Sequence, residues 1–564
     1  MMKKRNVVLG LGLAAALALT GCSSGGGSAD GGGSSGEAVK GGTLHVLATT
    51  DFSHLDPAQG WDGGVNNFYR LIYRQLTTFA GGDTDDPTEI VPDLATDLGT
   101  PNEDNTEWTF TLKDDIFFQD GTEITSEDVR FGVERSLDPD IAVGSPYAKI
   151  LLEGADDYEG VYKDGHLDSI ETPDDKTIVF HLNQPYADFG SAVAQPVYTP
   201  FPVDGDVTTT SIDKQPISSG PYVVSEYKPG STIVLERNEY WEPDSDEVRK
   251  AYPDSFVWTL GLDNSTIDER MIADQGDDKN AISGIILASS LSRIQEPSIQ
   301  ERTLEGLKGC TTYLALNTTK EPLNDLKVRQ AISYAIDKKS VQTATGGPAL
   351  TDIANTMLPP TVKGHQDFDL YPSENSEGDP EKAKELLKEA GYEDGFELSL
   401  DMRAVPVTQA QAESIQESLA KANIDVKLNV VDTAKYWQII GTPSQQTDAA
   451  IAGWCPDWPT GATFLPPLFE GSQIFDQGNS NIAQFDNEEV NERMAEIRKM
   501  TDVDEANKAW GELDKQILES APAVPLTWEK AVTVTGSNIA NAHLHEGYSG
   551  GIDYTVVGLK SVDE

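Results

Sequence analysis

The chain has 564 residues, of which 42 are basic and 93 acidic, giving a formal net charge of −51. So strong a negative charge makes nucleic acids and anionic lipid surfaces poor partners, and the scattered acidic residues predict a solvated surface. The length exceeds what one hydrophobic core usually organises, so two or three domains with sizeable cores are expected.

Residues 1–22 are organised as an export signal. Basic residues near the start are followed by an apolar run from Val7 to Leu19, which is too short for a membrane-spanning helix of about 20 residues. Leu19-Thr20-Gly21-Cys22 resembles the bacterial lipobox, in which the chain is cut before the cysteine and that cysteine is lipidated. The resemblance implies a lipid anchor at Cys22; an ordinary secretory signal with a chance cysteine is the alternative.

The next segment, Ser23 to Gly36, consists almost wholly of Gly and Ser. This composition cannot bury a core and behaves as a flexible coil. We therefore expect a signal peptide over 1–21 and a lipidated tether over 22–36, which would hold the protein at the outer leaflet of the bacterial cell membrane.

Two cysteines, Cys310 and Cys455, remain after Cys22. An even number of cysteines in an oxidising compartment predicts one disulfide between them. Two buried free thiols are the alternative.

The first half of the chain shows short strand and helix patterns. Thr43 to Ala48 is predicted as a strand and Asn66 to Leu76 as a helix, while Trp108, Phe110 and Leu112 alternate as in a strand with one buried face. After a turn at 119–122, Thr125-Ser126-Glu127-Asp128 has the pattern of a capping box that begins a helix ending near Ser136.

The second half alternates helical and strand patterns over short distances. Asp379-Pro380 is typical of an N-cap followed by proline at the first helical position, and Gly391 ends that helix. A strand over 396–400, a helix over 412–422 and a strand over 424–430 follow. This succession favours an α/β domain with a largely parallel sheet.

Several segments resemble one known family. Trp108-Thr109-Phe110-Thr111-Leu112-Lys113, the turn that follows it and the helix from Thr125 resemble a signature of the large solute-binding proteins of ABC importers, the oligopeptide-, dipeptide- and nickel-binding group. Further segments match in the same order along the chain: Leu55-Asp56-Pro57, Val91 to Ala95, Ser219 to Tyr222, Leu235 to Trp241, Asn317 with Pro322 to Ala331, and Gly453 to Pro459.

The resemblance implies an α/β, periplasmic-binding-protein-like clamp of type II with two lobes and three domains. Domain I would be discontinuous, covering 37–78, 200–307 and 523–564, with domain II at 79–199 and domain III at 308–522. The connections near Lys308 and Leu526 would form the hinge, because only there would the chain pass between the lobes.

The resemblance also implies ligand contacts. In peptide-binding relatives, the aspartate of the Gly-Trp-Cys-x-Asp segment pairs with the free amino group of the peptide, and Asp457 has this position here. A carboxylate in a closed cleft attracts an ammonium group more strongly than a surface carboxylate does. A turn or capping role beside Pro456 and Pro459 is the alternative.

Aromatic and basic residues near Asp457 are further candidates. Trp458 lies in a loop and is the better ligand candidate, whereas the apolar run 449–454 favours core packing for Trp454. Tyr436 and Trp437 could contact ligand or pack between strand and helix. Arg403 follows a strand and could bind a ligand carboxylate, although a solvated surface arginine is the favoured alternative.

Two other classes of function fit poorly. Gly547-Tyr548-Ser549-Gly550-Gly551 matches a hydrolase nucleophile pattern, but no histidine follows it, so a glycine-rich turn is expected and catalysis is not. His543, His545 and Glu546 lie close together and nickel-binding proteins belong to the same group. The remaining histidines are dispersed, however, so we expect neither a metal nor another cofactor.

The sequence therefore predicts a lipid-anchored, extracytoplasmic binding protein rather than an enzyme. Its expected ligand is a peptide, captured between the lobes and delivered to an ABC permease with separate ATPase subunits; nucleic acid is not expected, and the protein is expected to be a monomer. An oligosaccharide receptor of the same family is the alternative, because tryptophans could line its cleft. An aspartate at the amino-group position favours the peptide.

Overall fold

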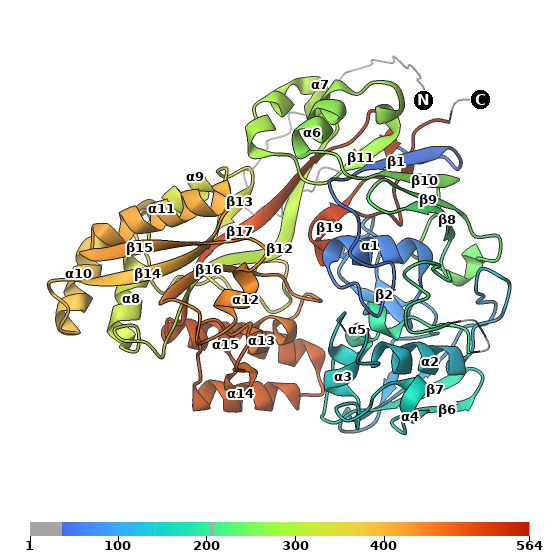
Figure 1. Ribbon diagram of the computed structural model, residues 1–564, viewed down its shortest axis with the longest axis horizontal. Coiled ribbons are helices and arrows are strands. Elements are labelled where there is room, and N and C mark those ends of the chain that lie inside the picture. Colours follow the sequence, from blue (N-terminus) through green and yellow to red (C-terminus); the bar gives the residue numbers. More distant parts are fainter. Residues whose placement is uncertain (1–35, 142, 204, 206, 563–564) are drawn as a thin grey trace, which may run out of the picture. The chain divides into compact units, whose positions relative to one another are not determined.

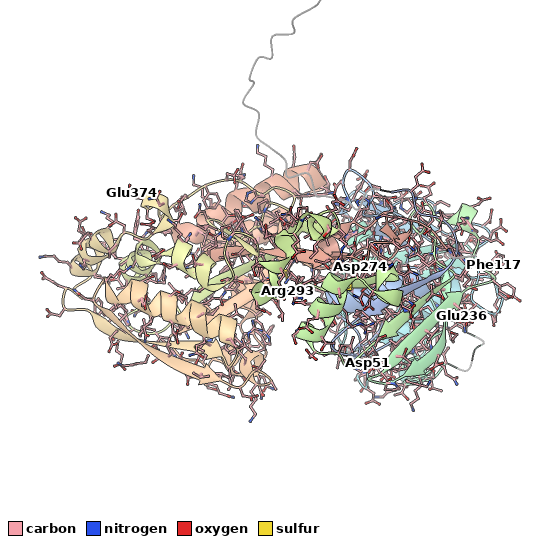
Figure 2. All side chains as sticks on the ribbon, turned by 90° about the horizontal axis from the view of Figure 1, so that it is seen from above. Asp51, Phe117, Glu236, Asp274, Arg293 and Glu374 are labelled. Carbon is pink, nitrogen blue, oxygen red and sulfur yellow. A yellow bond between two sulfur atoms is a disulfide. The ribbon has the colours of Figure 1, made fainter. Side chains whose placement is uncertain are left out.

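The computed structural model describes residues 36–141, 143–203, 205 and 207–562. The predicted signal peptide, Cys22 and tether residues 22–35 lie outside the described residues. Figure 2 shows exposed carboxylates on different parts of the described chain, including those of Glu236 and Glu374, in agreement with a scattered acidic surface.

The first sheet has the strand order β11-β1-β10-β9-β8. β1 runs parallel to β10 and β11, so the blue N-terminal strand lies among the green strands in Figure 1. Its helices include α1 (Gly63–Ile72), whose Phe68 and Leu71 are buried in the same core as Leu44 of β1. The strand bounds are β1 Thr43–Leu47, β8 Tyr222–Lys228, β9 Thr232–Arg237, β10 Ser255–Thr259 and β11 Ala281–Ser283, and α6 covers Asn264–Ala273.

The second sheet is antiparallel, with the order β4-β5-β7-β6. Phe110 of β5 and Phe180 of β7 are fully buried, as the alternating pattern predicts. α2 (Ser126–Ser136) packs with this sheet and begins with the predicted capping box between Thr125 and Asp128. The other bounds are β4 Thr100–Pro101, β5 Glu107–Thr111, β6 Ile170–Asp174, β7 Thr177–His181, α3 Tyr147–Leu151, α4 Val161–Asp164 and α5 Phe189–Ala192.

The third sheet has six strands in the order β13-β17-β12-β16-β14-β15. β14 pairs in parallel with β15 and β16, but β12, β13 and β17 pair antiparallel. The expectation of a largely parallel sheet is therefore wrong beyond the βαβ unit, because strands from outside that unit complete the sheet. The bounds are β12 Thr303–Leu316, β13 Thr351–Ile353, β14 Phe396–Arg403, β15 Ile424–Val431, β16 Ala449–Trp454 and β17 Ala523–Val534.

Helices cover both faces of this sheet (Figure 1). Alternate residues of a strand point to opposite faces, so Leu314 and Leu316 of β12 enter one core while Tyr313 and Ala315 enter the other. The first core contains α8 (Leu326–Ala335), α9 (Lys338–Ala344), α10 (Pro380–Glu389) and α11 (Pro406–Ala420); the second contains α12 (Tyr436–Ile440), α13 (Leu465–Phe469), α14 (Glu488–Arg498) and α15 (Val503–Glu519).

The two long strands β12 and β17 pair along most of their lengths and leave the six-stranded sheet together. Their far ends pack elsewhere: Leu304 of β12 belongs to the core of the first sheet, and Val532 of β17 packs with Ile267 of α6. Their register shifts between Leu307 and Thr311, which marks a β-bulge.

Smaller elements complete the described chain. They are α7 (Pro297–Gln300), β2 (Thr77–Phe79) paired with β3 (Ile90–Pro92), β18 (Ile539–Ala540) paired with β21 (Gly558–Leu559), and β19 (Leu544–His545) paired with β20 (Gly551–Ile552). No helix among the described residues has both the length and the apolar character needed to cross a membrane.

Candidate ligand-binding site

Two neighbouring parallel strands bring the predicted site residues to one edge of the six-stranded sheet. β14 and β16 are paired with Asp401 opposite Ala450, so their carboxyl ends lie at the same edge. Arg403 ends β14 and Trp454 ends β16, and Asp457 follows three residues later in the loop that leaves this edge. Ligands of open α/β sheets bind outside the carboxyl ends of the strands.

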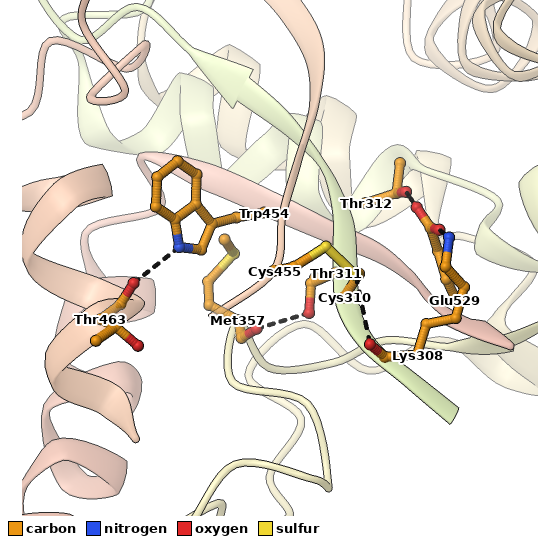
Figure 3. Close-up of a disulfide and its surroundings, with 9 residues drawn as sticks. All are labelled: Lys308, Cys310, Thr311, Thr312, Met357, Trp454, Cys455, Thr463 and Glu529. Carbon is orange, nitrogen blue, oxygen red and sulfur yellow. Dashed lines mark hydrogen bonds and ion pairs between the residues drawn. A yellow bond between two sulfur atoms is a disulfide. The ribbon is translucent and has the colours of Figure 1, made fainter. Parts of the chain in front are cut away.

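The predicted disulfide joins Cys310 to Cys455 (Figure 3). Cys310 lies at the β-bulge of β12, and Cys455 lies in the loop that carries Asp457. The two cysteines are therefore not free thiols, and the crosslink ties this loop to a long strand of the sheet.

An ion pair lies beside the disulfide (Figure 3). Nζ of Lys308 is 2.5 Å from Oε2 of Glu529 on β17, and the hydroxyl of Thr312 donates to Oε1 of the same carboxylate at 3.2 Å. Burial acts to raise the pKa of Glu529, but Lys308, Thr312 and, to a smaller extent, the charge of Arg403 outweigh it, so the pKa is lowered. These contacts connect β12 to β17 next to the bulge.

Asp457 is partly buried and is bonded to neutral donors. The hydroxyl of Tyr147 donates to its Oδ2 at 2.5 Å, and the indole of Trp61 also acts on the carboxylate. Burial raises the pKa of Asp457 to about 7, despite these two hydrogen bonds, which lower it. Among the described residues no basic side chain contributes to this pKa. A ligand ammonium group would therefore supply the positive charge that the carboxylate lacks.

Trp458 is buried, although its loop position favoured ligand contact. Only 1% of it is exposed, its ring centroid lies 4.4 Å from that of Tyr147, and its Nε1 donates a hydrogen bond to Asp188. It belongs to the core of the second sheet. The loop sequence does not reveal this burial, because Tyr147 and Asp188, both distant in sequence, enclose the ring.

Trp454 is half-buried and packs against the core that contains α12 to α15, in agreement with the packing role favoured by the apolar run. Its Nε1 donates to the carbonyl oxygen of Thr463 at 2.9 Å, and its ring lines a cavity described below. Trp454 thus combines core packing with a place in the wall of this cavity, and the more deeply buried Trp458 lines a second crevice.

Arg403 lies against aromatic rings. Its guanidinium carbon is 5.9 Å from the ring centroid of Tyr436 and 5.8 Å from that of Trp437. Within the described part of the chain it forms no ion pair, and its buried Nε has no hydrogen-bond partner. Such an arginine has free donors in a fixed place, which suits a carboxylate group.

Tyr436 and Trp437 are adjacent but differ in exposure. Tyr436 is fully buried, with its hydroxyl 2.6 Å from the carbonyl oxygen of Ile451. This side chain packs between α12 and the sheet, so the structure does not support it as a ligand contact. Trp437 is 50% exposed and lines the same cavity as Trp454.

This cavity, which we call the aromatic pocket, has a volume of about 560 Å³. Such a size is typical of small-molecule sites. Sequence reasoning missed most of its walls because they come from β12, α12 and the segment 477–482, which are far apart in the chain. Its lining residues are Tyr313, Trp437, Gln438, Gly453, Trp454, Gln477, Gly478, Asn479, Ser480 and Ile482.

A second crevice of about 390 Å³ lies where the segments 88–108 and 187–191 meet residues 458–460 and 503–507. Asp188 lines it, and burial raises the pKa of this aspartate to about 6, despite hydrogen bonds from Ser191 and Trp458. Trp458 also lines the crevice. Sequence reasoning found no signal for Asp188, because the contact spans 270 residues.

The histidines near the C-terminus do not form a metal centre with their neighbours. His545 is fully buried with Nε2 3.1 Å from the carbonyl oxygen of Ala80, and burial together with Arg70 lowers its pKa to about 4. The described residues contain no group of three or more His, Cys, Asp or Glu side chains placed to hold a metal ion. Ser549 has a φ of 56° and lies in a turn, as the glycine-rich pattern predicts.

Comparison with known sequences identifies clear relatives. Residues 89–476 match the middle region of the bacterial extracellular solute-binding proteins, family 5. The chain is 29% identical over 478 residues to heme-binding protein A of Haemophilus influenzae, covering 81% of each chain. It is 26% identical over 508 residues to a glutathione-binding protein of Salmonella paratyphi A, covering 88% and 90%, and 28% identical over 424 residues to the dipeptide-binding protein of Escherichia coli, covering 71% and 73%.

Solved structures of binding proteins are also similar to this chain. The clavulanic acid biosynthesis oligopeptide binding protein 2 superposes with a TM-score of 0.87 at 31% identity, covering 93% of this chain and 96% of the other. HbpA2 from Haemophilus parasuis superposes with a TM-score of 0.75 at 23% identity, covering 92% and 100%, and supports the fold alone.

Proposed function

Because the chain belongs to the bacterial extracellular solute-binding proteins of family 5, which are binding proteins for ABC transport and not enzymes, we propose that it captures peptides with free termini. The bound peptide is then delivered to an ABC permease whose ATPase subunits are separate chains. Relatives named for binding dipeptides, glutathione and oligopeptides support this ligand class.

One observation carries the choice of ligand. Among the described residues Asp457 is a carboxylate without a basic partner, and Arg403 is a cation that forms no direct ion pair, its charge acting on Glu529 only at longer range; both lie at the same edge of the sheet. A peptide with free ends brings an ammonium group that can pair with Asp457 and a carboxylate that can pair with Arg403. Each buried charge needs such a partner. A neutral oligosaccharide would satisfy neither, so this pair of charges favours the peptide.

The proposed movement is closure of two lobes about β12 and β17. In this proposal domain I covers 37–78, 200–307 and 523–564, domain II covers 79–199, and domain III covers 308–522. The hydrogen bond from Tyr147 to Asp457 would then join the second domain to the third. We propose that, as the lobes close, the amino group of the peptide replaces the hydroxyl of Tyr147 as the partner of the Asp457 carboxylate. Exclusion of water strengthens this ion pair.

The proposed location is the outer leaflet of the cell membrane, with a lipid on Cys22 and a tether up to residue 36. The family description as extracellular and the lipobox-like tetrad support it. The proposed oligomeric state is a monomer, because all of the proposed ligand contacts come from one copy of the chain.

The test is identification of the natural ligand. Protein beginning at residue 37 would be purified without denaturant, then unfolded, and the released small molecules analysed by mass spectrometry. Peptides with free amino ends would support the proposal. Released oligosaccharide, or a calorimetric affinity for peptides that N-acetylation leaves unchanged, would contradict it.

A further inference from the structure

We infer that the aromatic pocket selects peptides carrying a large uncharged aromatic side chain. This inference rests on the proposed function, because it assigns a preference to the same ligand. It concerns how the site discriminates among peptides, whereas Asp457 and Arg403 would recognise only the termini that all peptides share.

Three rings form the walls of the aromatic pocket. Tyr313 on β12 is 2% exposed and therefore fixed by packing. Trp454 already donates its indole N–H to Thr463, so it offers the pocket its apolar ring. Trp437 is 50% exposed and leaves a ring surface that a ligand would cover. Aromatic groups pack favourably against such rings in edge-to-face and offset arrangements.

The aromatic pocket contains no charged lining residue. None of its ten lining residues is Asp, Glu, Lys or Arg, although 24% of the chain is charged. Transferring a charged side chain into it would remove water without supplying a partner, which is unfavourable. Gln438, Gln477 and Ser480 provide neutral donors and acceptors that suit a phenol or an indole.

The polar wall is held in place by its own hydrogen bonds. The side chain of Asn479 donates to the carbonyl oxygens of Gly441 and Phe475, at 2.9 and 2.7 Å, and accepts from the amide of Phe475 at 2.5 Å. These bonds fix the segment 475–479 against the end of α12. A pocket formed in advance discriminates ligands better than one that must be ordered by binding.

The aromatic pocket is within reach of the proposed amino-end position. Trp454 lines it and Asp457 follows three residues later, so their Cα atoms are at most about 11 Å apart. An extended peptide advances about 3.3 to 3.6 Å per residue, so a side chain near its amino end can enter the pocket. The volume of about 560 Å³ accommodates the largest natural side chains.

The first test uses tripeptides of alanine in which each position in turn is replaced by Phe, Tyr, Trp, Lys or Glu. Calorimetry with the purified protein should show one position at which an aromatic residue tightens binding by about 10- to 100-fold over trialanine, as expected from burial of one large apolar side chain. Lys or Glu at that position should give no gain. Equal affinity for all side chains would overturn this inference but leave the proposed function intact, whereas absence of binding by every peptide would overturn both.

Two variants test whether the aromatic pocket causes the preference for an aromatic side chain. Trp437→Ala should reduce the ratio of affinities between the aromatic peptide and trialanine at least about fivefold, because it removes a wall of the pocket. Tyr240→Ala, a similarly exposed aromatic at 46%, should keep the wild-type ratio. An unchanged ratio in Trp437→Ala would contradict the inference.

A change of charge provides the opposite test. Gln438→Glu places a carboxylate in the aromatic pocket and should increase the affinity for the lysine peptide relative to the glutamate peptide by about fivefold or more. Gln300→Glu adds the same charge at an exposed position outside the pocket and should leave this ratio unchanged. No change in Gln438→Glu would argue against a side chain in this pocket.

Discussion

The hydroxyl of Tyr147 donates a hydrogen bond of 2.5 Å to Oδ2 of Asp457, although 310 residues separate them. The donor is neutral, and burial still holds the pKa of Asp457 near 7. A positively charged donor would lower this pKa far more than a phenol does. The contact therefore leaves the carboxylate able to gain from an ammonium group, and it makes Asp457 the residue whose substitution tests the site most directly.

Asp457→Asn should weaken binding of peptides with a free amino end by at least about 30-fold, because loss of one partner of a buried charge pair costs about 2 kcal/mol or more. Calorimetry with a peptide and its N-acetylated form would measure this. The acetylated peptide should bind the variant and the wild type with similar affinity. Asp394→Asn, at an exposed aspartate, serves as the matched control; a variant that binds the free peptide normally would rule out the proposed role.

Peptide affinity should fall as pH is lowered below about 7. The pKa of Asp457 is raised to about 7 by burial, and only its ionised form pairs with an ammonium group. Kd should therefore increase about tenfold per pH unit below this pKa, and binding at pH 6 should release a proton to the buffer. Calorimetry at pH 6 in two buffers of different ionisation enthalpy would detect the release, and a pH-independent Kd between 5 and 7 would contradict the prediction.

The stability of the unliganded protein should decrease from pH 5 to pH 8. Asp514 is 1% exposed and accepts hydrogen bonds from the amides of Met357 and Leu358, while burial raises its pKa to about 7. A carboxyl group whose pKa is higher in the folded state favours folding when protonated, and this contribution is lost as pH rises through that pKa. The loss is on the order of 2 to 4 kcal/mol.

Asp514→Asn should therefore flatten the dependence of Tm on pH, whatever its effect on Tm at a single pH. Thermal unfolding followed by circular dichroism at pH 5, 6, 7 and 8 would show this. Asp394→Asn should keep the wild-type slope. If Asp514→Asn kept the wild-type slope of Tm against pH, the buried carboxyl group of Asp514 would not be the source of the pH dependence.

Local signals explain which elements could be predicted from the sequence. The capping box at Thr125 and the Asp379-Pro380 start of α10 are determined by neighbouring residues, and both helices begin where predicted. Helix α1 begins at Gly63 instead of Asn66, because Asp62 accepts from the amides of Gly64 and Val65 and caps the helix there. The glycines in its first turn lack the apolar pattern from which a helix is predicted. Helix α11 begins at Pro406 and not at Ala412, since proline again occupies the first turn.

The site was predictable only in part, because its geometry depends on contacts between distant segments. The disulfide follows from counting cysteines in an oxidising compartment. The burial of Trp458 depends on Tyr147 and Asp188, and nothing in the loop sequence reveals either. Tyr313 could have been noticed from the alternation along β12, but its place in the aromatic pocket requires the sheet order.

Removal of the disulfide should destabilise the protein and weaken peptide binding together. The crosslink closes a loop across a sequence separation of 145 residues and ties the segment carrying Asp457 to β12. The double variant Cys310→Ser with Cys455→Ser should lose about 2 to 4 kcal/mol of unfolding free energy in urea titrations. Its affinity for peptide should fall because the loop becomes more mobile. Reductant should affect the wild type in the same direction and leave the double variant unchanged, and equal sensitivity of both would contradict this account.

Arg403→Gln should weaken binding of peptides with a free carboxyl end by about 10-fold or more, because hydrogen bonds to charged groups contribute about 1.5 to 3 kcal/mol. Arg403 forms no ion pair within the described part of the chain, and Glu529, whose pKa its charge helps to lower, keeps the ion pair with Lys308 in this variant. Amidation of the peptide should weaken binding to the wild type by a similar factor but should not further weaken binding to Arg403→Gln, since both changes remove the same contact. Arg293→Gln, at an exposed arginine on another part of the chain (Figure 2), should retain full sensitivity to amidation. If amidation weakened binding equally in Arg403→Gln and in the wild type, the carboxylate would be bound elsewhere, and the two opposite charges at the sheet edge would no longer favour a peptide over a neutral ligand.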